Sequence, residues 1–138
     1  MFIEIEWSWI EDDEDPRWQD QYCVYAYLHP THDWLLYVGK ADYATVRQRT
    51  HGRHKEELFD AITAEYSVEY LRAMHGGLLL PEGTRRTSQL LSDVESLLIM
   101  RLQPRWNIQS RQSRIARPGL RVRCAGEWPF KRVGFVDV

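Results

Sequence analysis

The sequence has few cysteines, no long apolar run and no group of closely spaced metal ligands. Its 138 residues include two cysteines, Cys23 and Cys124, which are too few for a disulfide-stabilised scaffold. No apolar run approaches the roughly 18 residues of a membrane-spanning helix, and the N-terminus lacks the basic start and apolar stretch of a secretory signal. We therefore expect a cytoplasmic protein that has no membrane partner and keeps both thiols buried and reduced.

Local spacing also predicts no zinc site. No Cys-x-x-Cys pair occurs, and the two close histidine pairs, His29/His32 and His51/His54, have no further ligand nearby. A function that depends on a zinc cluster is therefore not expected.

An excess of either charge is missing as well, because 18 Lys and Arg residues against 20 Asp and Glu residues give a net charge of −2. This value at first argues against a nucleic-acid partner, but the charge is unevenly distributed. Residues 1–20 contain eight acids and one base, residues 21–100 ten acids and eight bases, and residues 101–138 two acids and nine bases. The segments thus carry net charges of −7, −2 and +7, and the basic C-terminal segment favours contact with phosphates.

The length suits a single domain. Alternating polarity at residues 2–10, and aromatic and β-branched residues at 22–29 and 34–38, are typical of strands. The predicted strands are residues 2–10, 22–29, 34–38, 67–74, 120–124 and 133–138, and the predicted helices are residues 43–51, 55–65 and 88–102. We expect an α+β domain spanning residues 1–138, with a small, mostly antiparallel β-sheet flanked by helices.

Turn-forming and capping residues give the expected boundaries of these elements. Gly39 is expected to end the second hairpin strand, and Asp42 to cap the first helix, with Gly52 as its stop. The glycines at 76, 77 and 83 place residues 75–83 in a loop, and Pro104 ends the last helix.

One polar residue interrupts the apolar face of the last predicted helix. Positions 91, 95, 98 and 102 share a face, and all are leucine except Glu95. A buried carboxylate without a partner would be costly or would protonate, so an arginine, a lysine or a metal ion must lie nearby. The helix pattern alone favours neither a structural ion pair nor a metal site.

Other polar residues carry weaker signals. The candidates are Tyr25 and Tyr37 on the hairpin strands, Arg47 and His51 four residues apart on one helix face, and Asn107 in a turn. Each also has an ordinary interpretation as a strand aromatic, a solvated helix face or a turn residue. Lys40 lacks the glycine and Ser/Thr of a phosphate-binding loop, but it precedes a predicted helix and is placed to meet an anion.

Taken in order, these residues resemble the motifs of the GIY-YIG nuclease family. The two signatures correspond to Cys23-Val24-Tyr25 and Tyr37-Val38-Gly39, the second followed by Lys40-Ala41. Arg47 and His51 fall at the family's helix positions, and Glu95 resembles its metal-binding glutamate. The ending Gln103-Pro104-Arg105-Trp106-Asn107 is especially similar to the N-terminal nuclease domain found in bacterial excinucleases.

The resemblance covers residues 22–110, which would form the nuclease-like core. Residues 1–21, an acidic strand and loop, and residues 111–138, a basic extension, lie outside it. Cys23 stands where the family usually has glycine, and Val38 replaces isoleucine, but every polar position of the motifs is present.

The resemblance implies a metal-dependent DNA endonuclease that hydrolyses phosphodiester bonds at a single active site, nicking or cleaving a strand. Glu95 would hold Mg²⁺ (or Mn²⁺) together with water molecules. Arg47 would stabilise the pentavalent phosphorus, and Tyr25 or Tyr37 would activate water, with Tyr25 preferred. Because a tyrosine has a pKa of roughly 10, Lys40 and the metal would have to lower it. His51 would orient water or phosphate, and Asn107 would fix local geometry.

The expected partner is DNA, contacted by Arg105, Arg111, Arg114, Arg117 and Arg121. Residues 111, 114 and 117 would share a helix face, and residues 121 and 123 a strand face. A partner protein could supply specificity. The alternatives are a non-cleaving DNA-binding or protein-interaction module of the same fold, and a toxin or modification-system component. The acidic run at residues 11–15 could fold back on the basic tail and limit non-specific binding.

Overall fold

The computed structural model describes residues 1–107 and 117–137. Within them the chain forms a single six-stranded sheet of order β3-β2-β4-β1-β5-β6, three α-helices and one 3-10 helix, η1. The strands are β1 (Phe2–Trp9), β2 (Cys23–Leu28), β3 (Leu35–Ala41), β4 (Arg72–Leu79), β5 (Arg121–Gly126) and β6 (Gly134–Val136). The helices are η1 (Pro16–Gln19), α1 (Val46–Thr50), α2 (Arg53–Tyr66) and α3 (Ser88–Leu102). The expected α+β class is confirmed.

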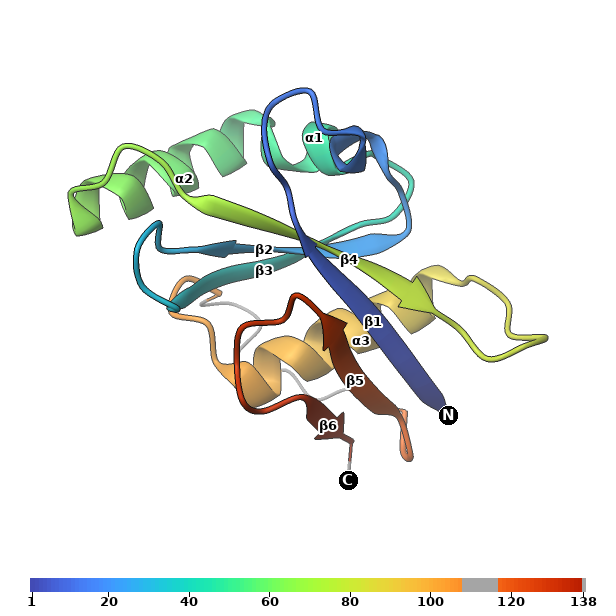
Figure 1. The fold of residues 1–138 in the computed structure, drawn as a ribbon. Helices are drawn as coiled ribbons and strands as arrows, with labels where there is room; N and C mark the ends of the chain where they lie inside the picture. The colour runs from blue at the N-terminus through green and yellow to red at the C-terminus, as the bar shows by residue number, and fades with distance from the viewer. Residues whose placement is uncertain (108–116, 138) are drawn as a thin grey trace.

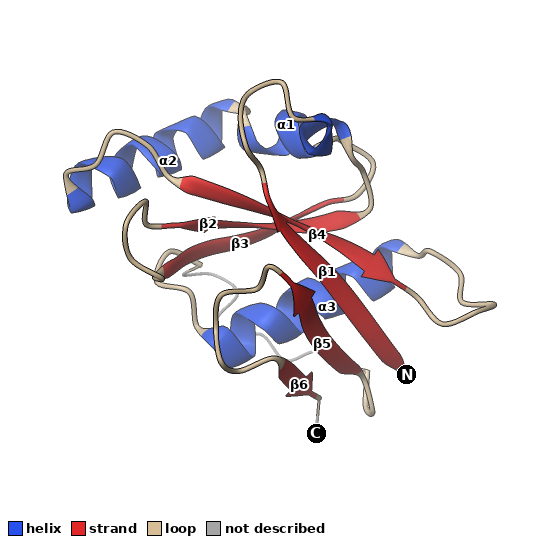
Figure 2. Cartoon of the chain, viewed as in Figure 1, coloured by secondary structure: helices blue, strands red, loops and turns tan. Residues whose placement is uncertain are grey.

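The sheet is mixed, although antiparallel pairing predominates. Neighbouring strands are antiparallel except for β1 and β5, which run parallel. Figure 2 shows the strands crossing with a strong twist and the helices lying on both sides. Within the described ranges, no helix has the length and apolar character needed to cross a membrane.

The two faces of the sheet bury separate apolar clusters. α3 packs on one face, where Ile3, Ile5 and Trp7 of β1 alternate inward with complete burial. η1, α1 and α2 cover the other face at the β2–β3 end, over a cluster that includes Trp18, Tyr25 and the other hairpin tyrosines. Figure 1 shows α1 and α2 above the sheet and α3 below it. Both cysteines are buried and free, as expected.

The hairpin and the first helix differ from the prediction in their boundaries. Gly39 does not end β3, which continues to Ala41 because its backbone remains paired with β2. α1 begins at Val46 rather than at residue 43, because Thr45 and Gln48 form a reciprocal capping box and Asp42 is not the cap. Gly52, expected to end the first helix, precedes α2 as its N-cap.

The position of β4 is the largest error of the prediction. Residues 67–71 precede the strand, and residues 75–77, expected in a loop, lie inside it. Ser67 takes a left-handed conformation that ends α2, and the chain needs the next residues to reach the sheet. Gly76 serves close packing rather than a turn, because an added Cβ would lie 2.7 Å from side-chain atoms of Ile5 and Val24.

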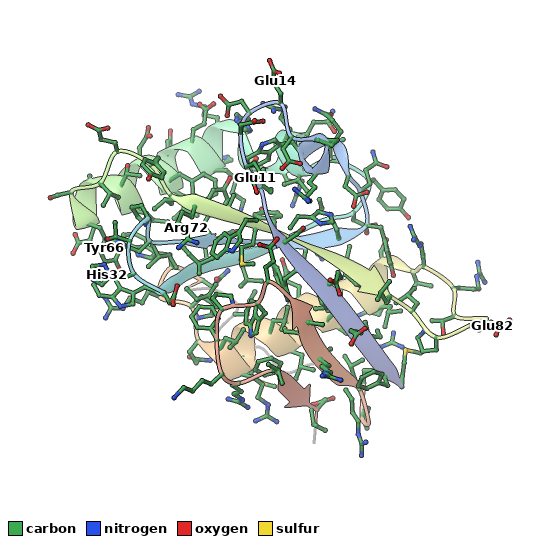
Figure 3. All side chains as sticks on the ribbon, in the orientation of Figure 1. Glu11, Glu14, His32, Tyr66, Arg72 and Glu82 are labelled. Carbon is green, nitrogen blue, oxygen red and sulfur yellow. The ribbon has the colours of Figure 1, made fainter. Side chains whose placement is uncertain are left out.

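The terminal segments complete the sheet. β1 lies between β4 and β5, so the acidic N-terminal strand and the basic C-terminal strand are neighbours, with Glu4 opposite Arg123. The acidic run at residues 11–15 leads into η1, and Figure 3 shows Glu14 projecting outward from this loop. Segments of opposite charge that lie far apart in the sequence are therefore partly brought together in space.

Candidate active site

The two candidate tyrosines lie on the β2–β3 hairpin, on the face covered by α1 and α2. Tyr25 is 2% exposed and Tyr37 9%, and their ring centroids are 6.3 Å apart. Tyr25 pairs in register with Gly39, and a Cβ on Gly39 would lie 2.4 Å from the Tyr25 ring. The absence of a side chain at Gly39 therefore lets the Tyr25 ring lie directly against β3.

Glu95 of α3 reaches the same region from the other side of the edge strand. Burial raises the pKa of its carboxyl group, while the charges of Lys40, Lys55 and Arg49 act in the opposite direction. In residues 1–107 and 117–137 these cations act at longer range, and none forms an ion pair with Glu95 within 4.0 Å. The compensating cations expected from the helix pattern are present, and the carboxylate remains without a direct ionic partner.

The hairpin and α3 converge near Tyr25, because Lys40 of β3 bonds to Ser92 of α3 and the charge of Glu95 contributes to the raised pKa of Tyr25. The pKa of Tyr25 lies well above its usual range because of burial, then the neighbouring Tyr37 and Tyr27, and then Glu95; Arg49 acts against the shift. The expectation that neighbours lower the pKa of the tyrosine is therefore not met for Tyr25 in the protein alone.

Two lysines hold the hairpin to the helices on either side. Lys40 Nζ donates to Ser92 Oγ, one turn before Glu95 on α3. Lys55 Nζ donates to the Tyr37 hydroxyl and lies 4.5 Å from the centre of its ring. A pocket of about 310 Å³ adjoins Lys40 and is also lined by Asp42, Tyr43, Ala44 and Arg49. Cations from three elements thus surround the Glu95 region.

Sequence reasoning missed Arg49 and Lys55. Arg49 lies two residues from Arg47, on a different side of α1, and Lys55 lies in the first turn of α2. Neither position carried a local signal, because their approach to Glu95 and Tyr37 depends on how α1 and α2 pack on the sheet.

Arg47 and His51 share a face, as predicted, but this face points toward the N-terminal segment. Arg47 donates to the Asp13 carbonyl, and its guanidinium lies 5.6 Å from the centre of the Trp18 ring. The His51 ring packs edge-on against Trp18, with Nδ1 3.0 Å from the Arg47 carbonyl oxygen. The structure thus brings Arg49 rather than Arg47 into electrostatic contact with Glu95.

Asn107 is buried and pairs with the outer edge of β3. Its Oδ1 accepts from the Val38 N–H and its Nδ2 donates to the Val38 carbonyl, both at 2.8 Å. Trp106 adds a backbone bond to the Leu36 carbonyl at 3.0 Å. This arrangement fixes the strand that carries Tyr37 and Gly39, in agreement with the expected role in local geometry.

The candidate DNA-binding arginines are dispersed. Arg105 is exposed and donates to the Tyr66 hydroxyl at 3.3 Å, and Arg121 is exposed on β5. Arg121 and Arg123 share a strand face, as expected, because the intervening Val122 is buried in the α3 core. Arg117 is not in a helix and forms an ion pair with buried Asp93 at 2.6 Å. The charge of Arg117 is therefore already paired.

Arg111 and Arg114 lie outside the described residues. The expected helix face shared by residues 111, 114 and 117 is therefore tested only at Arg117, which lies in an irregular segment.

Glu95 is the residue of this region that could supply an oxygen ligand to a magnesium ion. Mg²⁺ is bound in many proteins by one or two carboxylates and several water molecules. Glu95 supplies one such oxygen ligand that no cation occupies directly within the described ranges. Lys40, Lys55 and Arg49 would face an anionic substrate bound to such an ion.

Comparisons with known proteins add nothing to this geometry. No family model, curated protein or solved structure matches the chain. The site must therefore be interpreted from its own residues and contacts.

Proposed function

We propose that the protein is a metal-dependent DNA endonuclease that hydrolyses phosphodiester bonds. The observation that carries this proposal is a half-buried carboxylate, Glu95, that lacks a direct ionic partner in the described chain and lies within electrostatic range of Tyr25 and of the cations Lys40, Lys55 and Arg49. The resemblance of the ordered motifs to the GIY-YIG nucleases supports the same function and a fold of that type.

The metal would be Mg²⁺ or Mn²⁺ held by Glu95. Once bound, it would stabilise negative charge on the phosphate and leaving oxygen. Lys40 and Arg49 line one pocket and would hold the anionic backbone of DNA there. In this proposal Arg49 has the phosphate-stabilising role that the sequence suggested for Arg47.

Tyr37 is a better candidate than Tyr25 for removing a proton from the attacking water. A phenolate formed on Tyr37 would lie beside the Lys55 ammonium, which already donates to its oxygen. Among the described residues no cation donates a hydrogen bond to Tyr25, and burial favours its neutral phenol. Tyr25 would then orient the reacting groups through its hydroxyl, close to Glu95.

A non-cleaving DNA-binding module is the second candidate. Two observations favour it. The Arg47 guanidinium donates to the Asp13 carbonyl, and the pKa of Tyr25 is raised. Such a module would keep the cationic pocket and lose hydrolysis. A partner protein would then supply the activity or the specificity.

A plasmid-nicking assay with Mg²⁺ or Mn²⁺ tests the proposal. We expect the wild-type protein to nick supercoiled DNA with metal and to stop when EDTA is added. Glu95→Gln should reduce the rate at least about 100-fold, because the charged ligand is lost at similar size. Glu56→Gln, an exposed carboxylate on α2, is the matched control and should retain the wild-type rate.

Two further variants assign the tyrosines. Tyr37→Phe should lower the maximal rate more than Tyr25→Phe, and it should change the pH profile of nicking. Equal nicking by the wild type and Glu95→Gln, or no nicking at any metal concentration, would exclude the endonuclease. DNA binding in a mobility-shift assay without nicking would establish the second candidate.

A further inference from the structure

A second group of potential metal ligands lies on the same face of the sheet as the tyrosines. Asp20, Cys23 and His75 place one ligand atom each within 4.8 Å of the others. The His75 Nε2 and Asp20 Oδ2 atoms are 2.6 Å apart. Within residues 1–107 and 117–137, this is the one group of three such side chains. It does not include Glu95, and local spacing could not reveal it because His75 is far from the other two in the sequence.

Hydrogen bonds to neighbouring segments fix the position of Asp20. The Asp20 N–H donates to the Arg17 carbonyl at 3.2 Å, and the Asp20 carbonyl accepts from the Val46 N–H at 3.1 Å. Its second carboxylate oxygen accepts from the Gln21 N–H at 2.9 Å, which orients the group. Asp20 is thus anchored to η1 on one side and to α1 on the other.

Strand pairing brings in the other two ligands. Cys23 begins β2 opposite Gly77 of β4, and His75 lies two residues before Gly77 on the same face. Gly77 has no side chain that could separate the thiol from the imidazole. The His75 side chain is 12% exposed and that of Asp20 50%, so the group is open to solvent on one side.

The donor set selects a particular class of metal. A thiolate, an imidazole and a carboxylate suit Zn²⁺, whereas Mg²⁺ prefers oxygen ligands alone. Zinc–ligand bonds of about 2.0–2.3 Å in a tetrahedron imply ligand atoms roughly 3.3–3.6 Å apart. Small side-chain rotations that separate His75 from Asp20 and bring the Cys23 sulfur closer would satisfy this geometry. Water would take the fourth position.

We propose that Asp20, Cys23 and His75 form a Zn²⁺ site that is separate from the Mg²⁺ site proposed at Glu95. The inference goes beyond the proposed endonuclease function and does not depend on it. Cys23 occupies the position at which the GIY-YIG signature usually has glycine, so the thiol is a feature of this chain. The ion would join the η1–β2 junction to β4, beside Tyr25, which pairs with His75.

Binding requires one proton to leave. Cys23 is a free, buried cysteine, and its sulfur carries a proton in the metal-free protein at neutral pH because the ordinary pKa of a cysteine is about 8.5. Zn²⁺ forms a bond to sulfur as the S–H bond breaks, and the proton passes to the buffer. No oxidant or reductant takes part.

Metal titration of the full-length, reduced protein tests the site. Calorimetry with Zn²⁺ should give one ion per chain, and Co²⁺ should produce the near-ultraviolet charge-transfer band of a thiolate ligand. Cys23→Ser and His75→Gln should each weaken Zn²⁺ binding at least about tenfold, and Cys23→Ser, which removes the thiolate, should abolish the Co²⁺ band. Asp20→Asn, at an exposed side chain, should weaken binding without loss of folding, as checked by circular dichroism.

Matched controls separate this site from other thiols and from Glu95. Cys124→Ser removes the second buried thiol and should bind Zn²⁺ like the wild type. Glu95→Gln should also retain Zn²⁺, whatever its nicking activity. The proposal is overturned if the wild type binds no Zn²⁺, or if Asp20→Asn, Cys23→Ser and His75→Gln, once shown to be folded, all bind it with wild-type affinity.

Discussion

At the scale of a single residue, Gly39 shows how a strand position determines the geometry of the candidate active site. Gly39→Ala would place a methyl group 2.4 Å from the Tyr25 ring, so the ring or β3 must move. We expect a loss of about 1–3 kcal/mol in the free energy of unfolding, as for other overpacked sites, and reduced nicking. Urea denaturation and the plasmid assay measure the two effects.

Gly134→Ala is the matched control for Gly39. An added Cβ there meets no atom within 4 Å, so its free energy of unfolding should change by no more than about 0.5 kcal/mol. If both variants are equally stable, the close approach of Tyr25 to β3 does not require glycine.

At the scale of an element, the edge strand β3 depends on a side chain from outside the sheet. Asn107→Ala would leave the Val38 N–H and carbonyl without their partners, each at a cost of about 1–3 kcal/mol when buried. We expect a lower free energy of unfolding in urea and faster hydrogen exchange at Val38. The exposed amide of Gln19 provides the control, and Gln19→Ala should have little effect. Unchanged exchange at Val38 would refute the role of Asn107 in holding β3.

The elements also show which parts of the structure the sequence could predict. α3 has the predicted boundaries because its apolar period, Thr87 cap and following Pro104 all agree. The predicted strand at residues 67–74 differs from β4 because the sequence favours Gly76 and Gly77 as turn residues, whereas Gly76 permits close packing that depends on two other strands. Local pattern cannot distinguish these two uses of glycine.

The candidate site likewise has residues that the sequence predicts and residues that it does not. Tyr25, Tyr37, Lys40 and Glu95 were found from ordered motifs and from one carboxylate on an apolar helix face. The approach of Arg49 and Lys55 to this region was not predicted, and neither was the direction of Arg47 toward the N-terminal segment. These placements depend on how α1 packs on η1, β3 and α2, which no short stretch of sequence encodes.

At the scale of the whole molecule, the fold changes how the charge distribution must be tested. β1 is an inner strand, and Ile3, Ile5 and Trp7 are completely buried, so removal of residues 1–20 would destroy the core rather than expose a DNA-binding surface. The acidic loop at residues 11–15 contacts Arg47 through the Asp13 carbonyl. Its negative charge therefore lies beside a candidate catalytic arginine as well as near η1.

Neutralising the acidic loop by substitution tests whether it limits DNA binding. The variant combines three changes: Asp12→Asn, Asp13→Asn and Glu14→Gln. These side chains are exposed, and the Arg47 contact uses the Asp13 backbone, so the fold should persist. We expect at least about threefold tighter DNA binding at low salt in a fluorescence titration, with the difference shrinking as salt screens the charges.

The matched control makes the same change in net charge at three exposed acids of α2 and the following segment: Asp60→Asn, Glu65→Gln and Glu69→Gln. Equal tightening by both variants would mean that net charge alone matters, whereas a larger effect of the loop variant would show that its position beside Arg47 restrains DNA binding.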